Sequence, residues 1–293
     1  MPTLFCKPEN NFTNRLITIL SCLRIARLWG YDFILIWQIE KDKSATFHNC
    51  LSDFFNLDFQ ILRELPANIN LRVASTLPEN ARVCIRPESL CDVLMDRWAH
   101  VQFDISELGS SDLQSQVGKQ LRQIFSSNFN TSLQLNQLAA TLGYPEINPE
   151  ISVHYRKGAW ILERDKNLPM CTTSSENITL LAKHIIKQRN LESAFVCGSD
   201  TNSNHSICKD LTDDFPHLAI SVSRAVAFDP SFVNTGIAIL DFLTLIKSSY
   251  IVNSGISTFS AFAAFIGSAK LTSFVSDTEY VSVTSELGAG HGL

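Results

Sequence analysis

Strands and helices alternate along the second half of the sequence. Short apolar runs typical of strands occur at residues 151–155, 193–198, 218–222 and 250–253. Segments with helical spacing follow them at residues 174–189, 202–211, 237–247 and 257–266. Strand–helix–strand units connect parallel strands through right-handed crossovers, so this alternation predicts a parallel sheet covered by helices.

The first half of the chain opens with a helix followed by a strand. Between residues 14 and 30, polar side chains recur at every third position, which predicts a helix with one wet stripe and a wide buried face. The stripe consists of Arg15, Thr18, Ser21, Arg24 and Arg27. Residues 32–37 then form an apolar run that is typical of a buried parallel strand.

A boundary between two lobes is indicated near residue 147. Pro145 and Pro149 interrupt any helix just before the strand at 151–155. Residues 41–143 show apolar clusters with little regular spacing. We therefore predict an α/β protein with two lobes, residues 1–147 and residues 148–293, each built on a parallel, Rossmann-like sheet.

Composition and charge exclude several classes of protein. Hydrophobic residues make up 45% of the 293 residues and charged residues 18%, so the chain can bury a core and is not a disordered tail. The net charge of −5 gives no global basic field for a nucleic-acid backbone, and we expect no nucleic-acid partner. Any anion site must therefore be local.

The sequence also indicates a compartment. The 8 cysteines include no CxxC pair and several lie in apolar runs, which is typical of reduced core residues. The amino terminus lacks the basic and apolar regions of a signal peptide. The most apolar stretch, residues 236–267, is interrupted by Asp241, Lys247 and Asn253. We expect a cytoplasmic protein with no transmembrane segment.

Two candidate sites follow strands directly, where open α/β sheets bind their ligands. At the end of the strand 151–155, His154 is followed by Arg156, Lys157 and Gly158. Arg156 could fork onto a diphosphate, Lys157 could add a point charge, and Gly158 would let the backbone approach. The alternative is a solvated basic turn. Asp200, after the strand 193–198, could hold a ribose or form an ordinary Asx turn.

A third candidate site lies toward the carboxyl terminus. The strand at 250–253 runs into a loop of Gly, Ser and Thr that opens a helix, so hydroxyls and first-turn N–H groups would face an anion. Ser257 could equally be an N-cap. Asp241 stands in an apolar helix, where an ionised carboxylate is costly unless it is exposed or partnered. It is a candidate base-recognising or structural acid.

Several common motifs are absent from the sequence. It contains no GxxxxGK[ST], no GxGxxG after a strand, no HExxH, no GxSxG and no CxxC metal pair. The sequence therefore gives no support for four common classes: a P-loop hydrolase, a dinucleotide enzyme, a zinc protease or an α/β-hydrolase. The histidines other than His154 have no ligand-like spacing, so no metal site is expected.

Taken together and in this order, these blocks resemble the fucosyltransferase-like superfamily of GT-B glycosyltransferases. Residues 11–16, followed by the helix and a strand ending in Trp37, look like its G-x-G-N-R/Q motif. Residues 154–159 look like its H-x-R-R-G-D signature, and residues 199–200 stand where the family often has Thr-Asp. Residues 241–260 look like its D-x-x-x-L…S-x-F-S segment.

The resemblance implies a GT-B fold and a metal-independent, inverting glycosyltransferase of glycan biosynthesis. The donor would be GDP-fucose, held by the lobe 148–293, and the sugar would pass to a hydroxyl of a glycan acceptor on the side of the lobe 1–147. No cofactor besides the donor substrate is implied. Two alternatives remain: a catalytically inactive relative that binds a nucleotide sugar or a glycan, and a GT-B transferase with a different NDP-sugar donor.

The resemblance also implies roles for individual residues. His154 and Asp241 would recognise the guanine, and Asp200 belongs to the same donor site. The residues around the diphosphate or ribose would be Arg156, Lys157, Ser257, Thr258 and Ser260. Arg156 would stabilise the leaving GDP, and Asn14 would lie near the reacting sugar, so these two are the catalytic candidates.

The sequence departs from the family pattern at several positions. Asn11 and Thr13 replace the two motif glycines, and Ala159 replaces the signature aspartate. Lys157 keeps the charge of the second arginine but loses its fork. For the general base, the nearest acids downstream of the signature are Glu163 and Asp165.

Overall fold

The structure is a computed structural model of the chain. It describes residues 3–8, 12–37, 50–64, 66, 83–85, 111–146, 148–156, 173–224, 232–255, 257–274 and 280–283. The chain divides into two compact units, Met1–Asn136 with Pro230–Phe232 and Gln137–Asp229 with Val233–Leu293. Each unit carries a sheet of parallel strands, which confirms the predicted α/β fold class. The lobe boundary at residue 147 and the roles of the two lobes stay predictions.

The first unit is built on a small parallel sheet. The described strands of this sheet lie in the order β4-β2-β1-β5. The elements are β1 (Thr3–Cys6), α1 (Phe12–Trp29), β2 (Asp32–Ile36), η1 (Leu51–Asp53), β3 (Phe55–Asn56), β4 (Gln60–Leu62), β5 (Val83–Ile85), α3 (Ser111–Asn128) and β6 (Asn130–Thr131). The apolar run that predicted a buried strand is β2, and β1 pairs with it in parallel register.

The wet stripe predicted on α1 is wrong over the first half of that helix. Arg15, Thr18 and Ser21 are all buried. The guanidinium of Arg15 lies over the ring of Trp37, with its central carbon 4.9 Å from the ring centroid. The hydroxyl of Ser21 donates to the carbonyl of Ile17, 2.7 Å away. Contacts within the protein therefore replace the water that the periodicity predicted on this side.

The second half of α1 meets α3 through polar side chains. The Nε of Arg24 donates to Oε1 of Gln120 at 2.8 Å, and Nη2 of Arg27 donates to Oδ1 of Asn128 at 3.3 Å. Arg24 is half-buried and Arg27 is exposed, as the predicted stripe requires. α3 was visible in the sequence only as an apolar cluster, because its other positions are mostly polar.

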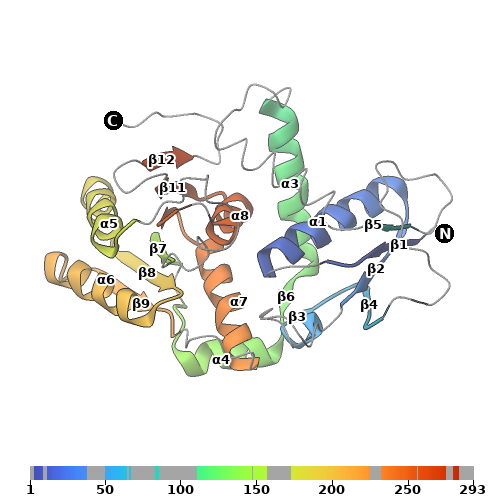
Figure 1. Ribbon diagram of the computed structural model, residues 1–293, viewed down its shortest axis with the longest axis horizontal. Helices are drawn as coiled ribbons and strands as arrows, with labels where there is room; N and C mark the ends of the chain where they lie inside the picture. The colour runs from blue at the N-terminus through green and yellow to red at the C-terminus, as the bar shows by residue number, and fades with distance from the viewer. Residues whose placement is uncertain are drawn as a thin grey trace, which may run out of the picture. The chain divides into compact units, whose positions relative to one another are not determined.

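The second unit carries the larger sheet, with strand order β12-β11-β10-β7-β8-β9 (Figure 1). Its described pairs are parallel except that β12 is antiparallel to β11. The elements are β7 (Ile151–Tyr155), α5 (Ser175–Arg189), β8 (Ser193–Gly198), α6 (Thr201–Asp214), β9 (Ala219–Val222), α7 (Phe232–Ile246), β10 (Tyr250–Asn253), α8 (Thr258–Gly267), β11 (Lys270–Phe274) and β12 (Tyr280–Val283). The division between the two units falls within α4 (Leu133–Leu142).

The predicted alternation of this unit is confirmed. The strands expected at 151–155, 193–198 and 250–253 coincide with β7, β8 and β10, and β9 begins one residue later than expected. α6 extends to Asp214 and α7 begins at Phe232, so both are longer than their predicted segments. β11 and β12 were not predicted.

α5 is buried on one face only. Leu180 is 63% exposed and His184 is exposed, whereas Ile178 and Ala182 are fully buried. Ser174 is the N-cap of α5, and its hydroxyl accepts the N–H of residue 177 at 3.2 Å.

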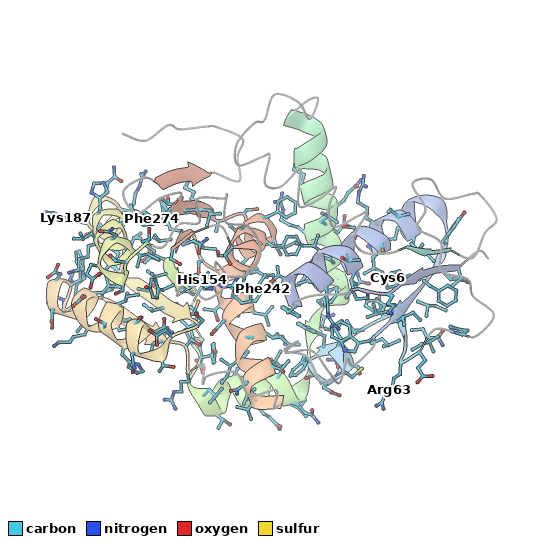
Figure 2. All side chains as sticks on the ribbon, viewed as in Figure 1. Cys6, Arg63, His154, Lys187, Phe242 and Phe274 are labelled. Carbon is cyan, nitrogen blue, oxygen red and sulfur yellow. The ribbon has the colours of Figure 1, made fainter. Side chains whose placement is uncertain are left out.

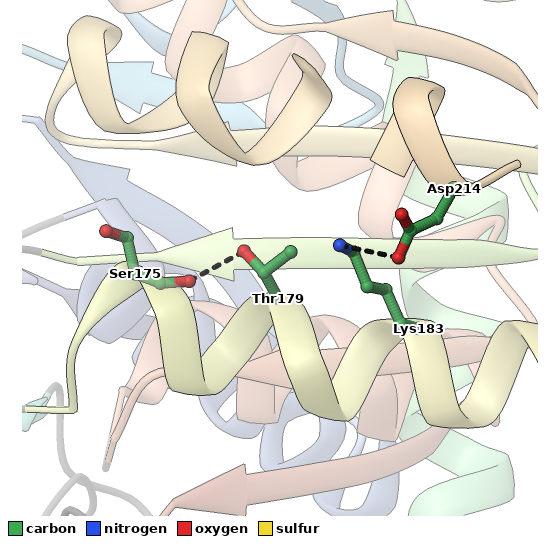
Figure 3. A network of polar contacts seen from close by, with 4 residues as sticks. All are labelled: Ser175, Thr179, Lys183 and Asp214. Carbon is green, nitrogen blue, oxygen red and sulfur yellow. Dashed lines mark hydrogen bonds and ion pairs between the residues drawn. The ribbon is translucent and has the colours of Figure 1, made fainter. Parts of the chain in front are cut away.

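Figure 3 shows two polar contacts of α5, one within the helix and one with the end of α6. The hydroxyl of Thr179 donates to the carbonyl of Ser175 at 2.6 Å, and Lys183 reaches Asp214 at the end of α6, with Nζ 2.8 Å from Oδ2. Ion pairs this exposed contribute about 0–1 kcal/mol. The two helices are therefore held to the sheet by their apolar faces rather than by this pair.

The two faces of the larger sheet differ in polarity. On one face Ile151, Val153 and Tyr155 of β7 pack in an apolar core with residues of α5 and α6. Successive strand residues point to opposite faces, so Ser152 and His154 lie on the other one. This second face is covered by α8, and Figure 1 shows α5 and α6 across the sheet from it. The polar face is where the candidate site lies.

Candidate functional site

His154 lies on the polar face, near the carboxyl end of β7, and is labelled in Figure 2. Its Nδ1 lies 3.3 Å from Oδ1 of Asn253 on β10 and 3.3 Å from Oγ of Ser260 on α8. Its ring lies 5.3 Å from that of Phe259. Burial and the charge of Arg156 lower the pKa of His154 to about 4, so the ring is neutral at pH 7. A neutral imidazole offers one donor and one acceptor.

Asn253 ties this histidine to the loop before α8. Its Nδ2 donates to the carbonyl of Gly255 and, at 3.4 Å, to Oγ of Ser273 on β11. The hydroxyl of Ser273 donates to the same carbonyl at 3.1 Å. Sequence reasoning missed both residues as part of the site. The sequence does contain a sign of them, because Asn253 and Ser273 are polar residues near the carboxyl ends of the neighbouring parallel strands β10 and β11.

The amino end of α8 brings two of the predicted serines together. Ser257 is the N-cap and Ser260 lies in the first turn, 4% and 0% exposed respectively. The hydroxyl of Ser257 does not cap the helix, and it has no hydrogen-bond partner among the described residues. The side chain of Thr258, which begins α8, lies outside the described residues. An unpaired buried hydroxyl at a helix amino end is suited to a bound anion.

Arg156 follows β7 directly and is half-buried. Its backbone N–H donates to Oγ of Ser254 at 2.9 Å, and the N–H of Ser254 donates to the carbonyl of His154 at 3.2 Å. These bonds join the carboxyl ends of β7 and β10. Burial lowers the pKa of Arg156, but a guanidinium stays cationic in proteins. Residues 157–172 lie outside the described residues, and with them Lys157, Ala159, Glu163 and Asp165.

Asp241 on α7 is buried and partnered, as its apolar surroundings required. Its Oδ1 accepts the hydroxyl of Tyr144 at 2.6 Å and its Oδ2 accepts the hydroxyl of Ser223 at 2.8 Å. Burial raises the pKa of Asp241 to about 7, although both hydrogen bonds lower it. Burial raises the pKa of the Cys197 thiol, and the charge of Asp241 raises it further. Cys197 of β8 is the register partner of His154 on the neighbouring strand β7, so both side chains point to the polar face. Asp241, which lies near Cys197, is therefore on the same face as His154.

Asp200 is the N-cap of α6, at the carboxyl end of β8. Its Oδ2 accepts the hydroxyl of Ser203 at 2.5 Å, so the carboxylate is held within its own turn. Gly198 closes β8 against β7: a Cβ there would lie 1.8 Å from the carbonyl oxygen of Tyr155. Only a glycine fits this contact without displacing the end of β7.

The structure therefore gathers part of the predicted site in the second unit. His154, Ser257 and Ser260 converge, and Arg156 follows His154 by two residues. Asp241 of α7 lies near Cys197 of β8, and Asp200 caps α6 directly after β8. Asn14 belongs to α1 in the first unit, and its side chain lies outside the described residues.

Two further properties bear on the predicted chemistry. Within the described ranges, no group of three or more His, Cys, Asp or Glu side chains could hold a metal ion. Where the structure describes the chain, no helix is both long enough and apolar enough to cross a membrane. The cytoplasmic location stays a prediction.

Known structures share this fold, although the sequence itself matches no protein-family model and no curated protein. NodZ alpha-1,6-fucosyltransferase soaked with GDP-fucose is similar with a TM-score of 0.55 and 12% identity, over 97% of this chain and 99% of that one. POFUT1 in complex with GDP-fucose gives 0.53 and 13%, over 90% and 93%. An Arabidopsis thaliana FUT1 mutant in complex with GDP gives 0.52 and 11%, over 92% and 69%. The chain thus has the fold of the GT-B fucosyltransferases, as the resemblance implied.

Proposed function

We propose that this protein transfers fucose from GDP-fucose to a hydroxyl of a glycan, with inversion at the anomeric carbon and without a metal. The observation that carries the proposal is the amino end of α8. The buried Ser257 hydroxyl there has no hydrogen-bond partner among the described residues, and Ser260 of the same turn contacts the neutral His154. Neighbours of the same fold bind GDP or GDP-fucose. The donor chemistry below follows from these residues.

The guanine would lie on the polar face of the larger sheet. A carboxylate at Asp241 accepts the N1–H and N2–H donors of guanine, a pattern that adenine and the pyrimidines do not offer. His154 contributes one further donor or acceptor while it stays neutral. Asp200, at the next strand, would hold the ribose hydroxyls. This arrangement supports a preference for GDP over other nucleoside diphosphates.

The diphosphate would lie between Arg156 and the amino end of α8. Arg156 can bind two phosphate oxygens at once, and the first-turn N–H groups of α8 add donors with the positive end of the helix dipole. Ser257, Ser260, Thr258 and Lys157 complete the set. The Ser257 and Ser260 hydroxyls are buried and positioned by the fold before the reaction, so they stabilise the charge that develops as GDP leaves.

The transfer itself is a single displacement. The acceptor oxygen forms a bond to the anomeric carbon, the bond from that carbon to the GDP oxygen breaks, and the hydroxyl proton passes to a base. Glu163 and Asp165 stay the candidates for that base. Asn14 of α1 would assist at the sugar, on the acceptor side.

Thermal stabilisation by nucleotides tests the donor site. We expect GDP and GDP-fucose, but not ADP or UDP, to raise the melting temperature, with no effect of EDTA. A ligand at about 100 times its Kd adds about 2.7 kcal/mol of stability. Arg156→Ala should lose this shift while melting near the wild-type temperature without ligand, because its side chain is half-buried at the surface.

The outcome also decides between the two alternatives. A shift with a different nucleotide would indicate a GT-B transferase with another NDP-sugar donor. GDP-selective binding without transfer to any glycan in an acceptor screen would indicate an inactive relative. Absence of any nucleotide shift would overturn the donor site altogether.

Ser257→Ala separates binding from folding at the same site. Because the hydroxyl has no partner among the described residues and does not cap α8, its loss should leave the melting temperature of the free protein unchanged or higher. A hydrogen bond to a charged group contributes roughly 1.5–3 kcal/mol, so the affinity for GDP should fall about 10- to 100-fold. Calorimetric titration measures the affinity. A destabilised protein with unchanged affinity would contradict this role.

A further inference from the structure

Two hydroxyls from distant parts of the chain hold the carboxylate of Asp241. Tyr144 lies 97 residues before it and Ser223 lies 18 residues before it. We propose that Tyr144 and Ser223 are positioning residues for guanine recognition: they aim the Asp241 carboxylate and keep it in the form that accepts the N1–H and N2–H donors. The inference rests on the proposed function, because it concerns the same base site.

Each hydroxyl is itself fixed by the fold. The ring of Tyr144 packs against Phe195 of β8 with centroids 6.0 Å apart, and its hydroxyl also lies 3.3 Å from the carbonyl of Ile237 on α7. Ser223 follows β9 and is 1% exposed. Its N–H donates to the carbonyl of Val196 at 2.8 Å, which anchors it to the sheet. Tyr144 cannot turn away from Asp241 without breaking its contacts with β8 and α7, and the backbone of Ser223 is fixed to β8.

Both hydroxyls donate to the carboxylate, and this direction decides their effect. Donors stabilise the ionised carboxylate, which has only acceptor sites, over the protonated acid. Burial acts in the opposite direction and sets the pKa of Asp241 at about 7. Among the described residues the titratable groups facing Asp241 are Tyr144 and Cys197, both uncharged at pH 7, and no cation contributes. The two hydroxyls are therefore the local groups that favour ionisation.

A carboxylate balanced in this way links base recognition to pH. Guanine offers two donors to Asp241, so the ionised form binds it and the protonated form places a third donor against them. GDP affinity should thus rise as the pH rises through about 7 in the wild type. The hydrogen bond from Tyr144 lowers the pKa of Asp241, so removing the Tyr144 hydroxyl should raise that pKa. The pH at which GDP affinity changes should then be higher as well.

The experiment combines two titrations of the full chain, wild type and Tyr144→Phe. The first follows the carboxyl carbon of Asp241 by NMR with labelled aspartate, assigned by its absence in Asp241→Asn. The second measures the Kd for GDP between pH 5.5 and pH 8.5. We expect both midpoints to rise by about one pH unit in Tyr144→Phe, since a hydrogen bond to a charged group is worth at least that much. The ring and its contact with Phe195 are retained.

Two matched variants accompany this change. Ser223→Ala removes the second donor and should move both midpoints in the same direction, which keeps the test available if Tyr144→Phe does not fold. Tyr250→Phe on β10 removes a phenol whose hydroxyl makes no hydrogen bond among the described residues, and it should leave both midpoints unchanged.

The results distinguish this inference from the proposed function. If GDP binds but neither midpoint moves in Tyr144→Phe or Ser223→Ala, the positioning role is wrong and the donor site stands. If the wild type binds no GDP at any pH, the proposed function is wrong and the base-positioning role falls with it, whatever the carboxyl titration shows. A midpoint that moves downward would also overturn the inference.

Discussion

Asp241→Asn is expected to remove a fall in stability of about 4 kcal/mol that the wild-type carboxylate causes between pH 4 and pH 7. The pKa of Asp241 is raised from 3.8 to about 7 in the folded protein, chiefly by burial. Between these values the folded state holds a proton that the unfolded state has released. The free energy of unfolding therefore decreases as the pH rises through this range, and it levels off above pH 7.

His154 should act in the opposite direction. Its pKa is lowered from 6.5 to about 4 by burial and by Arg156, so between these values the unfolded state binds a proton that the folded state does not. The free energy of unfolding then rises with pH, by about 3 kcal/mol in total. In the wild type the two contributions nearly cancel, and each single variant reveals the other.

Urea unfolding at a series of pH values between 4 and 8 checks both slopes. The Asp241→Asn profile minus the wild-type profile should rise with pH, and the His154→Gln difference should fall. Taking differences removes the other titrating groups, which all proteins in the series share. Difference profiles that stay flat across this range would show that neither group titrates as its burial predicts.

The second large effect is expected from Gly198→Ala. The added Cβ would lie 1.8 Å from the carbonyl oxygen of Tyr155 and 2.8 Å from its carbonyl carbon, and both are backbone atoms that cannot rotate away. The end of β7 must move, which should lower the free energy of unfolding by about 3 kcal/mol, the upper part of the usual range for overpacking. Arg156 follows that strand end, so the stabilisation by GDP should be lost as well.

Gly143→Ala is the matched control. No atom lies within 4 Å of the added Cβ, and the only cost is the left-handed backbone, φ +68°, which is about 1 kcal/mol. GDP should still stabilise this variant. If Gly198→Ala unfolds at the same urea concentration as Gly143→Ala, then the strand end tolerates the methyl group and the close approach carries no constraint.

The sequence predicted the strands of the second unit better than the helix faces. β7, β8 and β10 are short runs that are buried on both sides, and their length distinguishes them from helices. A helix face depends on which neighbours cover it. Arg15 and Thr18 follow a polar period but lie inside the first unit, and Leu180 fits an apolar stripe but is exposed. Periodicity does not contain that information.

The site shows the same division. The resemblance assigned His154, Ser257 and Ser260 to one donor site, and the structure brings them together at the end of β7 and the start of α8. Tyr144 and Ser223 were missed, because their contacts with Asp241 depend on how α7 packs on the sheet. No local motif marks a phenol 97 residues from its carboxylate.

The difference in polarity between the two faces of the larger sheet also determines the register of its strands. A slip of β7 by one residue would turn His154 into the apolar core under α5 and α6 and bring Val153 or Tyr155 to Oδ1 of Asn253 and Oγ of Ser260. An imidazole would then lose its polar partners, and a misaligned sheet would be much less stable than the native one. His154, which we propose binds the nucleotide, therefore also selects the native strand pairing during folding.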